Sequence, residues 1–220
     1  MRTRNAVALI ALLVPGATLA AQTSTSIGLR LGTLGVGVEA NRLLSDHFGV
    51  RVSGNYFSLS RNATKEDVTY DATLKLQAFT GLADLYPSKR GAFHLSAGVA
   101  TNPLKFSGIG QSNGGGNITI NSTSYTTAQV GTLTASIKYP SVSPYLGLGF
   151  GTPASKKSGL GVVFDVGAAI GKPTVGLSST NAGNVAGLQA DIDAEAAKVQ
   201  KSANKLSFWP VLSLGLAYRF

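Results

Sequence analysis

The last fifteen residues of the chain, Leu206–Phe220, alternate between two kinds of side chain. A period of two indicates a β-strand with two unlike faces. An apolar face opposite a small or polar one, with aromatic residues at its end, is typical of a barrel strand that faces lipid. The last strand of a soluble sandwich is the alternative. The apolar face consists of Leu212, Leu214, Leu216, Tyr218 and Phe220.

The first twenty residues have the pattern of a secretory signal. Arg2 and Arg4 precede the apolar run Ala6–Val14, and small residues lead to a predicted cut after Ala20. The run is too short to span a membrane, and no later stretch approaches the ~20 apolar residues of a membrane helix. We therefore predict a signal peptide over residues 1–20 and one exported domain over 21–220. The absence of cysteine excludes a disulfide framework.

The composition favours a membrane barrel over a soluble periplasmic domain. Charged residues make up 13% of the chain, whereas soluble domains carry about a quarter. The 27 glycines suit a narrow barrel interior. The formal net charge is +9, to which Arg2 and Arg4 contribute two charges. The remaining basic residues are scattered without interleaved aromatics, so nucleic acid is not an expected partner.

Eight segments read as strands. The first two form a hairpin across Gly32–Thr33 in which Leu31 pairs with Leu34, although a single bulged strand over 24–44 is an alternative. The sixth is interrupted by prolines, so two strands over 130–150 are an alternative to one. The segments are Ile27–Leu31, Leu34–Val38, Phe48–Leu59, Val68–Tyr86, Phe93–Ala100, Val130–Phe150, Leu160–Ile170 and Leu206–Phe220.

One connection departs from this pattern. Between Asn184 and Asn204 the apolar residues are spaced by three and four, which predicts a helix. We expect this helix to cover the barrel rim, with a partner or a membrane surface as the alternative. Strand parity places short turns on the side of Phe220 and long loops, 102–127 and 172–205, on the other side.

These elements predict an all-β fold: an eight-stranded antiparallel transmembrane up-and-down β-barrel with one short helix before the last strand. An interior of this size is filled by side chains, so inward-facing charges should form ion pairs across the lumen. A narrow polar conduit is the alternative. On strand 68–86, alternation places Leu76, Ala78 and Leu82 outward. The predicted inward charged set is Arg30, Glu39, Arg51, Asp71, Lys75, His94, Asp165 and Arg219.

The chain resembles small eight-stranded outer-membrane barrels of the OmpW-like and OmpA-like families. The resemblance lies in Gly215–Phe220, Tyr86–Gly98 and Ser143–Phe150. It implies a location in the cell outer membrane, contact with membrane lipid and lipopolysaccharide, and insertion by the barrel-assembly machinery, for which a terminal Phe is a recognition signature. OmpW-like proteins are thought to admit small hydrophobic compounds, which implies such a solute here.

The expected function is therefore structural, or a narrow conduit for small solutes. One alternative is a surface interaction protein that binds through loops 102–127 and 172–205. A second is a lipid hydrolase, because His94 and Ser96 share a strand face and resemble the His-Ser pair of lipid A deacylases. That motif continues with Asn where this chain has Ala97, and both side chains are predicted to face inward. We predict no enzyme, no metal site and no cofactor.

Overall fold

The computed structural model describes residues 24–220 except 66–67, 89–90, 102–103, 113–114 and 152–157. The predicted signal peptide, residues 1–20, lies outside the described residues. The strands form one sheet of eleven strands and a separate two-stranded hairpin, and every pairing is antiparallel. The chain is thus all-β in its main architecture, with two helices in the described part.

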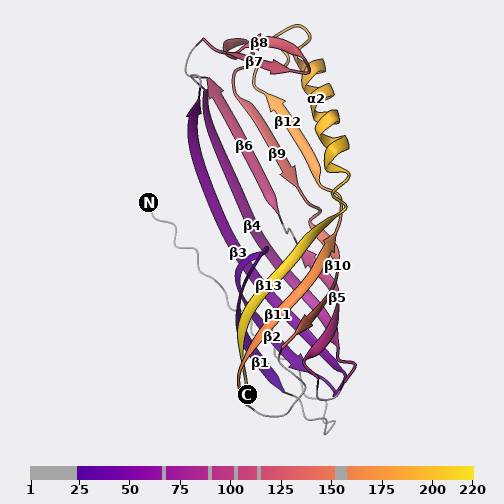
Figure 1. Ribbon diagram of the computed structural model, residues 1–220. Helices are drawn as coiled ribbons and strands as arrows, with labels where there is room; N and C mark the ends of the chain where they lie inside the picture. The colour runs from indigo at the N-terminus through magenta and orange to yellow at the C-terminus, as the bar shows by residue number, and fades with distance from the viewer. Residues whose placement is uncertain (1–23, 66–67, 89–90, 102–103, 113–114, 152–157) are drawn as a thin grey trace.

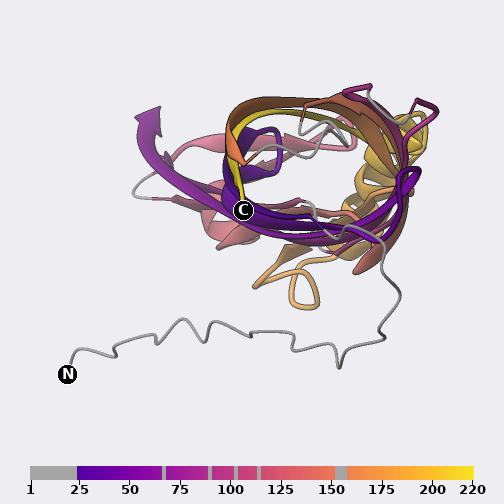
Figure 2. The ribbon, with the colours of Figure 1, turned by 90° about the horizontal axis from the view of Figure 1, so that it is seen from below.

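Eight strands of the large sheet close into a ring, because β13 pairs with β1 and β4 pairs with β5. Figure 1 shows this barrel in the lower half of the molecule, and Figure 2 shows the ring along its axis. The ring matches the predicted number of barrel strands, but three further strands extend the sheet. In ring order the strands are β1 (Thr25–Gly32), β2 (Gly35–Leu43), β3 (Phe48–Lys65), β4 (Val68–Leu85), β5 (Phe93–Thr101), β10 (Val142–Phe150), β11 (Gly159–Ile170) and β13 (Phe208–Arg219).

The first hairpin forms as predicted, but its register differs by two residues. Leu31 pairs with Val36 rather than Leu34, and Thr33 and Leu34 form the turn. Gly35 follows with a φ of +105°, a conformation that favours glycine. The shift turns Leu34 into the barrel, where it is only 6% exposed and packs in an apolar cluster of the lumen.

The predicted facing of β4 within the barrel is wrong. Leu76, Ala78 and Leu82 are buried inside, whereas Phe79 is 61% exposed on the outer surface. The upper part of the lumen is apolar, so the large apolar residues of this strand fill the interior. Alternation correctly separated the two faces of the strand, but it could not indicate which of them pointed inward.

The segment 130–150 contains two strands, β9 (Leu133–Lys138) and β10, which agrees with the two-strand alternative rather than with one strand. It begins at the last residue of a short helix, α1 (Thr127–Val130). Only β10 belongs to the ring. The segment predicted as a loop over 102–127 also contains strands, β6 (Lys105–Ser112), β7 (Asn117–Ile120) and β8 (Thr123–Thr126). Their Ser-, Thr- and Gly-rich sequences resemble loops, and only pairing with distant strands makes them β-structure.

The long strands β3 and β4 continue beyond the ring, and the three additional strands join the sheet there. The lower half of β4, Phe79–Leu85, pairs with β5, and its upper half, Val68–Lys75, pairs with β6. β9 and β12 (Thr174–Ser179) follow β6 in the same sheet. We call the upper halves of β3 and β4 with β6, β9 and β12 the distal sheet, which stands above the ring in Figure 1.

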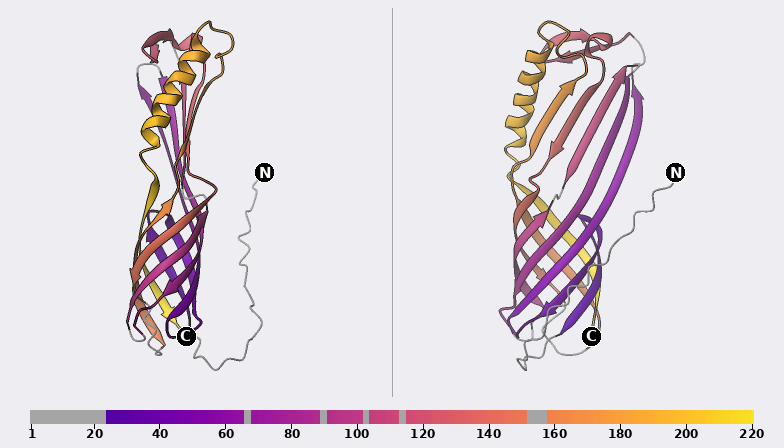
Figure 3. Two further views of the ribbon diagram at one scale, coloured as in Figure 1. Left: turned by 90° about the vertical axis from the view of Figure 1, so that its right-hand side faces the viewer. Right: turned by 180° about the vertical axis from the view of Figure 1, so that it is seen from behind.

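The predicted helix is α2 (Leu188–Ala203), and it covers the distal sheet rather than the barrel rim. It lies along β12 and reaches the β7–β8 hairpin at the tip of the molecule, as both views in Figure 3 show. Leu188 and Ile192 are fully buried in a cluster with Tyr125 and residues of the hairpin. With α1, the described chain has two helices, where one was predicted.

The two ends of the barrel differ as strand parity predicted. The C-terminus lies at the end that carries the turn around Leu44–His47, and the distal sheet rises from the opposite end (Figure 1). The segments 102–127 and 172–205 both lie on the distal side, although they are largely folded into strands and helices.

Candidate functional site

The lumen of the barrel is crossed by a network of buried charges centred on Arg51. This residue lies on β3, and its guanidinium spans the interior to reach carboxylates on two other strands. Nη1 is 2.8 Å from Oδ1 of Asp165 on β11, and Nη2 is 3.0 Å from Oδ1 of Asp84 on β4. All three side chains are almost completely buried. Such charges are tolerated inside a protein only when they are paired.

A second arginine extends the network around the ring. Arg30 on β1 forms ion pairs with Glu39 on β2, at 2.8 Å from Nε to Oε2, and with Asp165. Its Nη1 also donates to the hydroxyl of Ser213 on β13, at 3.0 Å. Because Arg51 lies 3.7 Å from Glu39, the two arginines share two carboxylates. The network thereby joins strands on opposite sides of the barrel.

His94 and Ser96 on β5 complete this network, which we call the charged layer. His94 Nε2 donates to Asp165 Oδ1 at 3.0 Å. The Ser96 hydroxyl accepts from Arg51 at 2.8 Å and donates to Asp84 at 2.6 Å. Both side chains are buried and face the lumen, away from the outer surface of the barrel.

Glycines make room for these contacts. Gly149 on β10 lies between His94 and Asp165 in the sheet. A Cβ atom at this position would lie 2.4 Å from Asp165 Oδ1 and 2.5 Å from His94 Nε2, which is too close for either atom. Gly147 and Gly167 similarly leave space for the ring of Tyr145. The absence of side chains at these inward positions therefore allows large groups to meet across strand β10.

Above the charged layer the lumen narrows to a small recess. Tyr145, Leu82 and Val211 pack with Leu34, the residue that the hairpin register turns inward. The volume open to a water-sized sphere is about 20 Å³, close to the ~10–15 Å³ that a single water needs. The charged layer and this apolar cluster lie one above the other in the described lumen. The lining residues are Arg30, Gly32, Leu34, Gly35, Ser53, Asn55, Thr80, Leu82, Tyr145, Val211 and Ser213.

The structure brings together five of the eight predicted inward charges: Arg30, Glu39, Arg51, His94 and Asp165. Arg219 is also buried, close to the C-terminal end of the barrel. Lys75 and Asp71 do not lie in the lumen, which corrects their predicted placement. They belong to the part of β4 in the distal sheet, where Lys75 is exposed and Asp71 is partly buried.

The sequence prediction missed Asp84, which has no exposed surface and contacts Arg51 and Ser96. It was missed because the facing of β4 was inverted. Asn41, which donates to Asp84 at 3.4 Å, and Tyr145 were missed as well. The sequence contained an indication that a carboxylate was missing, because the residues predicted to face the lumen include more cationic than anionic side chains. An additional buried carboxylate was needed to balance them.

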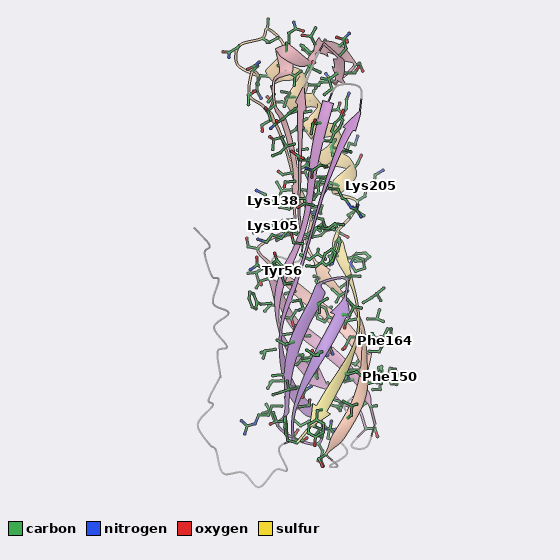
Figure 4. The ribbon with its side chains drawn as sticks, turned by 90° about the vertical axis from the view of Figure 1, so that its left-hand side faces the viewer. Tyr56, Lys105, Lys138, Phe150, Phe164 and Lys205 are labelled. Atoms are coloured by element: carbon green, nitrogen blue, oxygen red, sulfur yellow. The ribbon has the colours of Figure 1, made fainter. Side chains whose placement is uncertain are left out.

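The outer surface of the barrel is an apolar belt. The residues predicted to face lipid, Leu212, Leu214, Leu216, Tyr218 and Phe220, are each between 47% and 67% exposed. Figure 4 shows Phe150 and Phe164 pointing away from the barrel on the same surface. Water-soluble monomers rarely expose an apolar surface of this extent, whereas hydrocarbon solvates it without cost.

No helix in the described part of the chain is long and apolar enough to cross a membrane. Among the described residues, no group of three or more His, Asp or Glu side chains is arranged to hold a metal ion.

Comparison with known proteins identifies the fold. No protein-family model matches the chain, and no curated protein matches it significantly in sequence. Among solved structures, Acinetobacter baumannii CarO2 is similar with a TM-score of 0.56 and 19% identity, covering 90% of this chain and 98% of that one. Acinetobacter baumannii CarO is similar with a TM-score of 0.54 and 21% identity, covering 89% and 97%. The chain shares its fold with these proteins over nearly their whole length.

Proposed function

We propose that the chain is an integral outer-membrane β-barrel whose lumen is sealed and which holds the distal sheet outside the membrane. The observation that carries this proposal is the Arg51 network, which fills the cross-section of the barrel with paired charges. An eight-stranded barrel has little space to spare once such side chains are present. The apolar belt supports a membrane location, and the fold shared with CarO and CarO2 supports a barrel of this kind.

A narrow conduit for small polar solutes is the second candidate. The recess above Arg51 is lined partly by the polar side chains of Ser53, Asn55 and Thr80. A rearrangement of the arginines would connect this recess to the other end of the barrel. Sealing is favoured because the network must break to open such a path, and breaking buried ion pairs is costly.

A conduit for hydrophobic solutes of the OmpW-like kind has less support. Such a solute would leave the lumen through a lateral opening in the wall. In the described part of the ring, every neighbouring pair of strands is hydrogen-bonded. A role in surface interaction would fall to the distal sheet and α2, because the segments 102–127 and 172–205 are folded into these elements. We further propose that the protein is not an enzyme, since His94 and Ser96 are held by carboxylates inside the barrel.

Conductance in planar lipid bilayers tests the sealed lumen. We expect no steady conductance from the native protein. Replacing Arg51 with Ser removes the side chain that spans the lumen and should produce conducting events. Arg42→Ser is the matched control, because Arg42 is on the exposed face of the neighbouring strand β2. A stable open channel in the native protein would overturn the sealed lumen in favour of the conduit.

A further inference from the structure

Three lysines form a row across the distal sheet just above the barrel. Lys75 on β4 pairs in register with Lys105 on β6, and Lys105 pairs with Lys138 on β9. Residues paired in register point to the same face of a sheet, and neighbouring strands are about 4.8 Å apart. The row therefore concentrates three positive charges within about 10 Å. We call Lys75, Lys105 and Lys138 the lysine row.

Within the part of the chain that the structure describes, the lysine row has no partner that neutralises it. All three side chains are exposed, and the described residues provide no hydrogen bond or ion pair to them. Directly opposed like charges destabilise a sheet. The nearest acidic residue along the same face of β4 is Asp71, four residues beyond Lys75 and roughly 13 Å away along the strand. An anion bound from outside the protein would reduce this repulsion between the lysines.

The position of the row relative to the apolar belt indicates which anion. Tyr56, which is exposed on the outer face of β3, pairs with Gln77. Gln77 is two residues from Lys75 on the same face of β4, so the row lies roughly 7 Å along the strand above Tyr56. Figure 4 shows Lys105 and Lys138 on one side of the sheet above Tyr56. Tyrosines on barrel exteriors mark the boundary between hydrocarbon and headgroups.

The face above the row is also polar. The next register row on the same face contains Thr73, Ser107 and Ser136, which supply hydroxyl groups beside the ammonium groups. The opposite face of the distal sheet is apolar and partly covered by α2. Among the described residues of the distal sheet, the face that carries the lysine row thus combines positive charge with hydrogen-bond donors.

We propose that the lysine row binds the phosphate groups of a phosphorylated glycolipid in the outer leaflet of the membrane. This inference rests on the proposed membrane location but is independent of whether the lumen is sealed. The ligand is a lipid rather than a free anion, because the row directly adjoins the belt that acyl chains would cover. The distal sheet would thereby be held at a fixed height on the membrane surface.

The test measures binding of bisphosphorylated lipid A to the detergent-solubilised protein by native mass spectrometry. The variant K75Q/K105Q/K138Q removes the row. The control R61Q/K198Q/K201Q removes the same number of positive charges from α2 and from the opposite face of the distal sheet. A lysine near an anionic lipid surface contributes about a fivefold change in affinity. We therefore expect the row variant to bind between about ten- and a hundredfold more weakly, and the control to bind within about twofold of the native protein.

Two further measurements separate the possible causes. K75R/K105R/K138R preserves the charge and should retain binding, and heat-modified gel mobility shows whether each variant is folded in the membrane. Inorganic phosphate should compete only at far higher concentration than lipid A. Unchanged binding by a folded row variant, an equal loss in the control, or equally tight binding of inorganic phosphate would each overturn the proposal. The membrane location itself is tested separately by insertion of the same variants into vesicles.

Discussion

At the scale of single residues, Arg51 is the most constrained side chain of the barrel. Its guanidinium contacts Asp84, Asp165 and Ser96 from three different strands. The side chain is buried and does not reach solvent. Forming a complete network and losing one member of it have unequal effects on stability. A complete buried ion pair contributes little compared with an apolar core, but removal of one partner leaves an uncompensated charge.

Replacing Arg51 with Met should therefore destabilise the barrel strongly. Asp84 and Asp165 would lose their principal cation while remaining buried. We expect the free energy of unfolding to fall by about 3 to 5 kcal/mol. Urea unfolding of the protein in lipid vesicles measures this change. Arg42→Met should change it by less than about 0.5 kcal/mol, since surface substitutions usually have small effects. Equal effects of the two substitutions would contradict the proposed role of the network.

A second prediction concerns Gly149. The variant Gly149→Ala places a methyl group against Asp165 and His94, so that their hydrogen bond must lengthen or break. We expect a loss of about 1 to 3 kcal/mol in unfolding free energy, as for other overpacked interiors. Gly161→Ala is the control, because a Cβ there has only Ala217 O nearby, at 4.0 Å. If both variants have native stability in the same urea experiment, the close packing around Gly149 is wrong.

At the scale of elements, the tip of the distal sheet is held to α2 by polar contacts. Tyr125 on β8 donates to Asp191 at 2.6 Å, and Asn121 donates to the other carboxylate oxygen at 2.9 Å. The hydrogen bond from Tyr125, followed by that from Asn121, lowers the pKa of Asp191 from its ordinary value of 3.8. The same bond to Asp191 raises the pKa of Tyr125 above its ordinary value of 10.0.

The docking of α2 on the β7–β8 hairpin should consequently depend on pH at both extremes. Because the folded-state pKa of Asp191 is lowered, its contribution is present above pH 3.8 and is lost as the pH falls through the lowered value. The raised pKa of Tyr125 means that its contribution is lost as the pH rises through a value above 10.0.

Hydrogen exchange of the backbone amides in α2 measures this dependence. Protection in the native protein should decrease at low pH after correction for the intrinsic exchange rate. Asp191→Asn should weaken protection near neutral pH and remove the acid-dependent decrease. Asp193→Asn, the same replacement at an exposed position of the same helix, leaves Asp191 intact and should retain the native profile. An acid-dependent decrease that persists in Asp191→Asn would show that another group is responsible.

At the scale of the whole molecule, two bodies of different character share one continuous sheet. The barrel has an apolar exterior and a charged interior, whereas the distal sheet has a polar face and an apolar face covered partly by α2. The long strands β3 and β4 belong to both bodies, since each runs from the base of the barrel to the upper end of the sheet (Figure 1). In the proposed membrane location, hydrocarbon covers the outer belt and so stabilises this inverted arrangement.

Charge placed on the belt tests that statement. Leu214 is 58% exposed in the middle of β13, so Leu214→Arg should lower the unfolding free energy in vesicles by about 2 to 4 kcal/mol, as at a bilayer midplane. Leu206 is equally exposed but precedes β13 on the distal side, where Leu206→Arg should cost about 0 to 1 kcal/mol. A negligible effect of Leu214→Arg would mean that the belt is not in contact with hydrocarbon.

The sequence by itself determined the exterior of this protein. A period-two pattern ends at Phe220, and equivalent patterns occur on most other ring strands. These patterns located the ring strands along the chain, because a strand that faces lipid requires large apolar groups at every second residue. It also located α2 through its 3.6-residue period. Five members of the charged network followed from the same alternation.

Only the tertiary structure decided how β4 faces, where Asp84 lies and that the chain builds a distal sheet. On β4 both the lumen and the exterior accept apolar side chains, so alternation does not distinguish them. The strands β6, β9 and β12 depend on hydrogen bonds between residues far apart in the chain, and these leave no periodic signal in polar, glycine-rich segments. Local patterns report the solvent that each face meets, whereas strand pairing is a property of the assembled sheet.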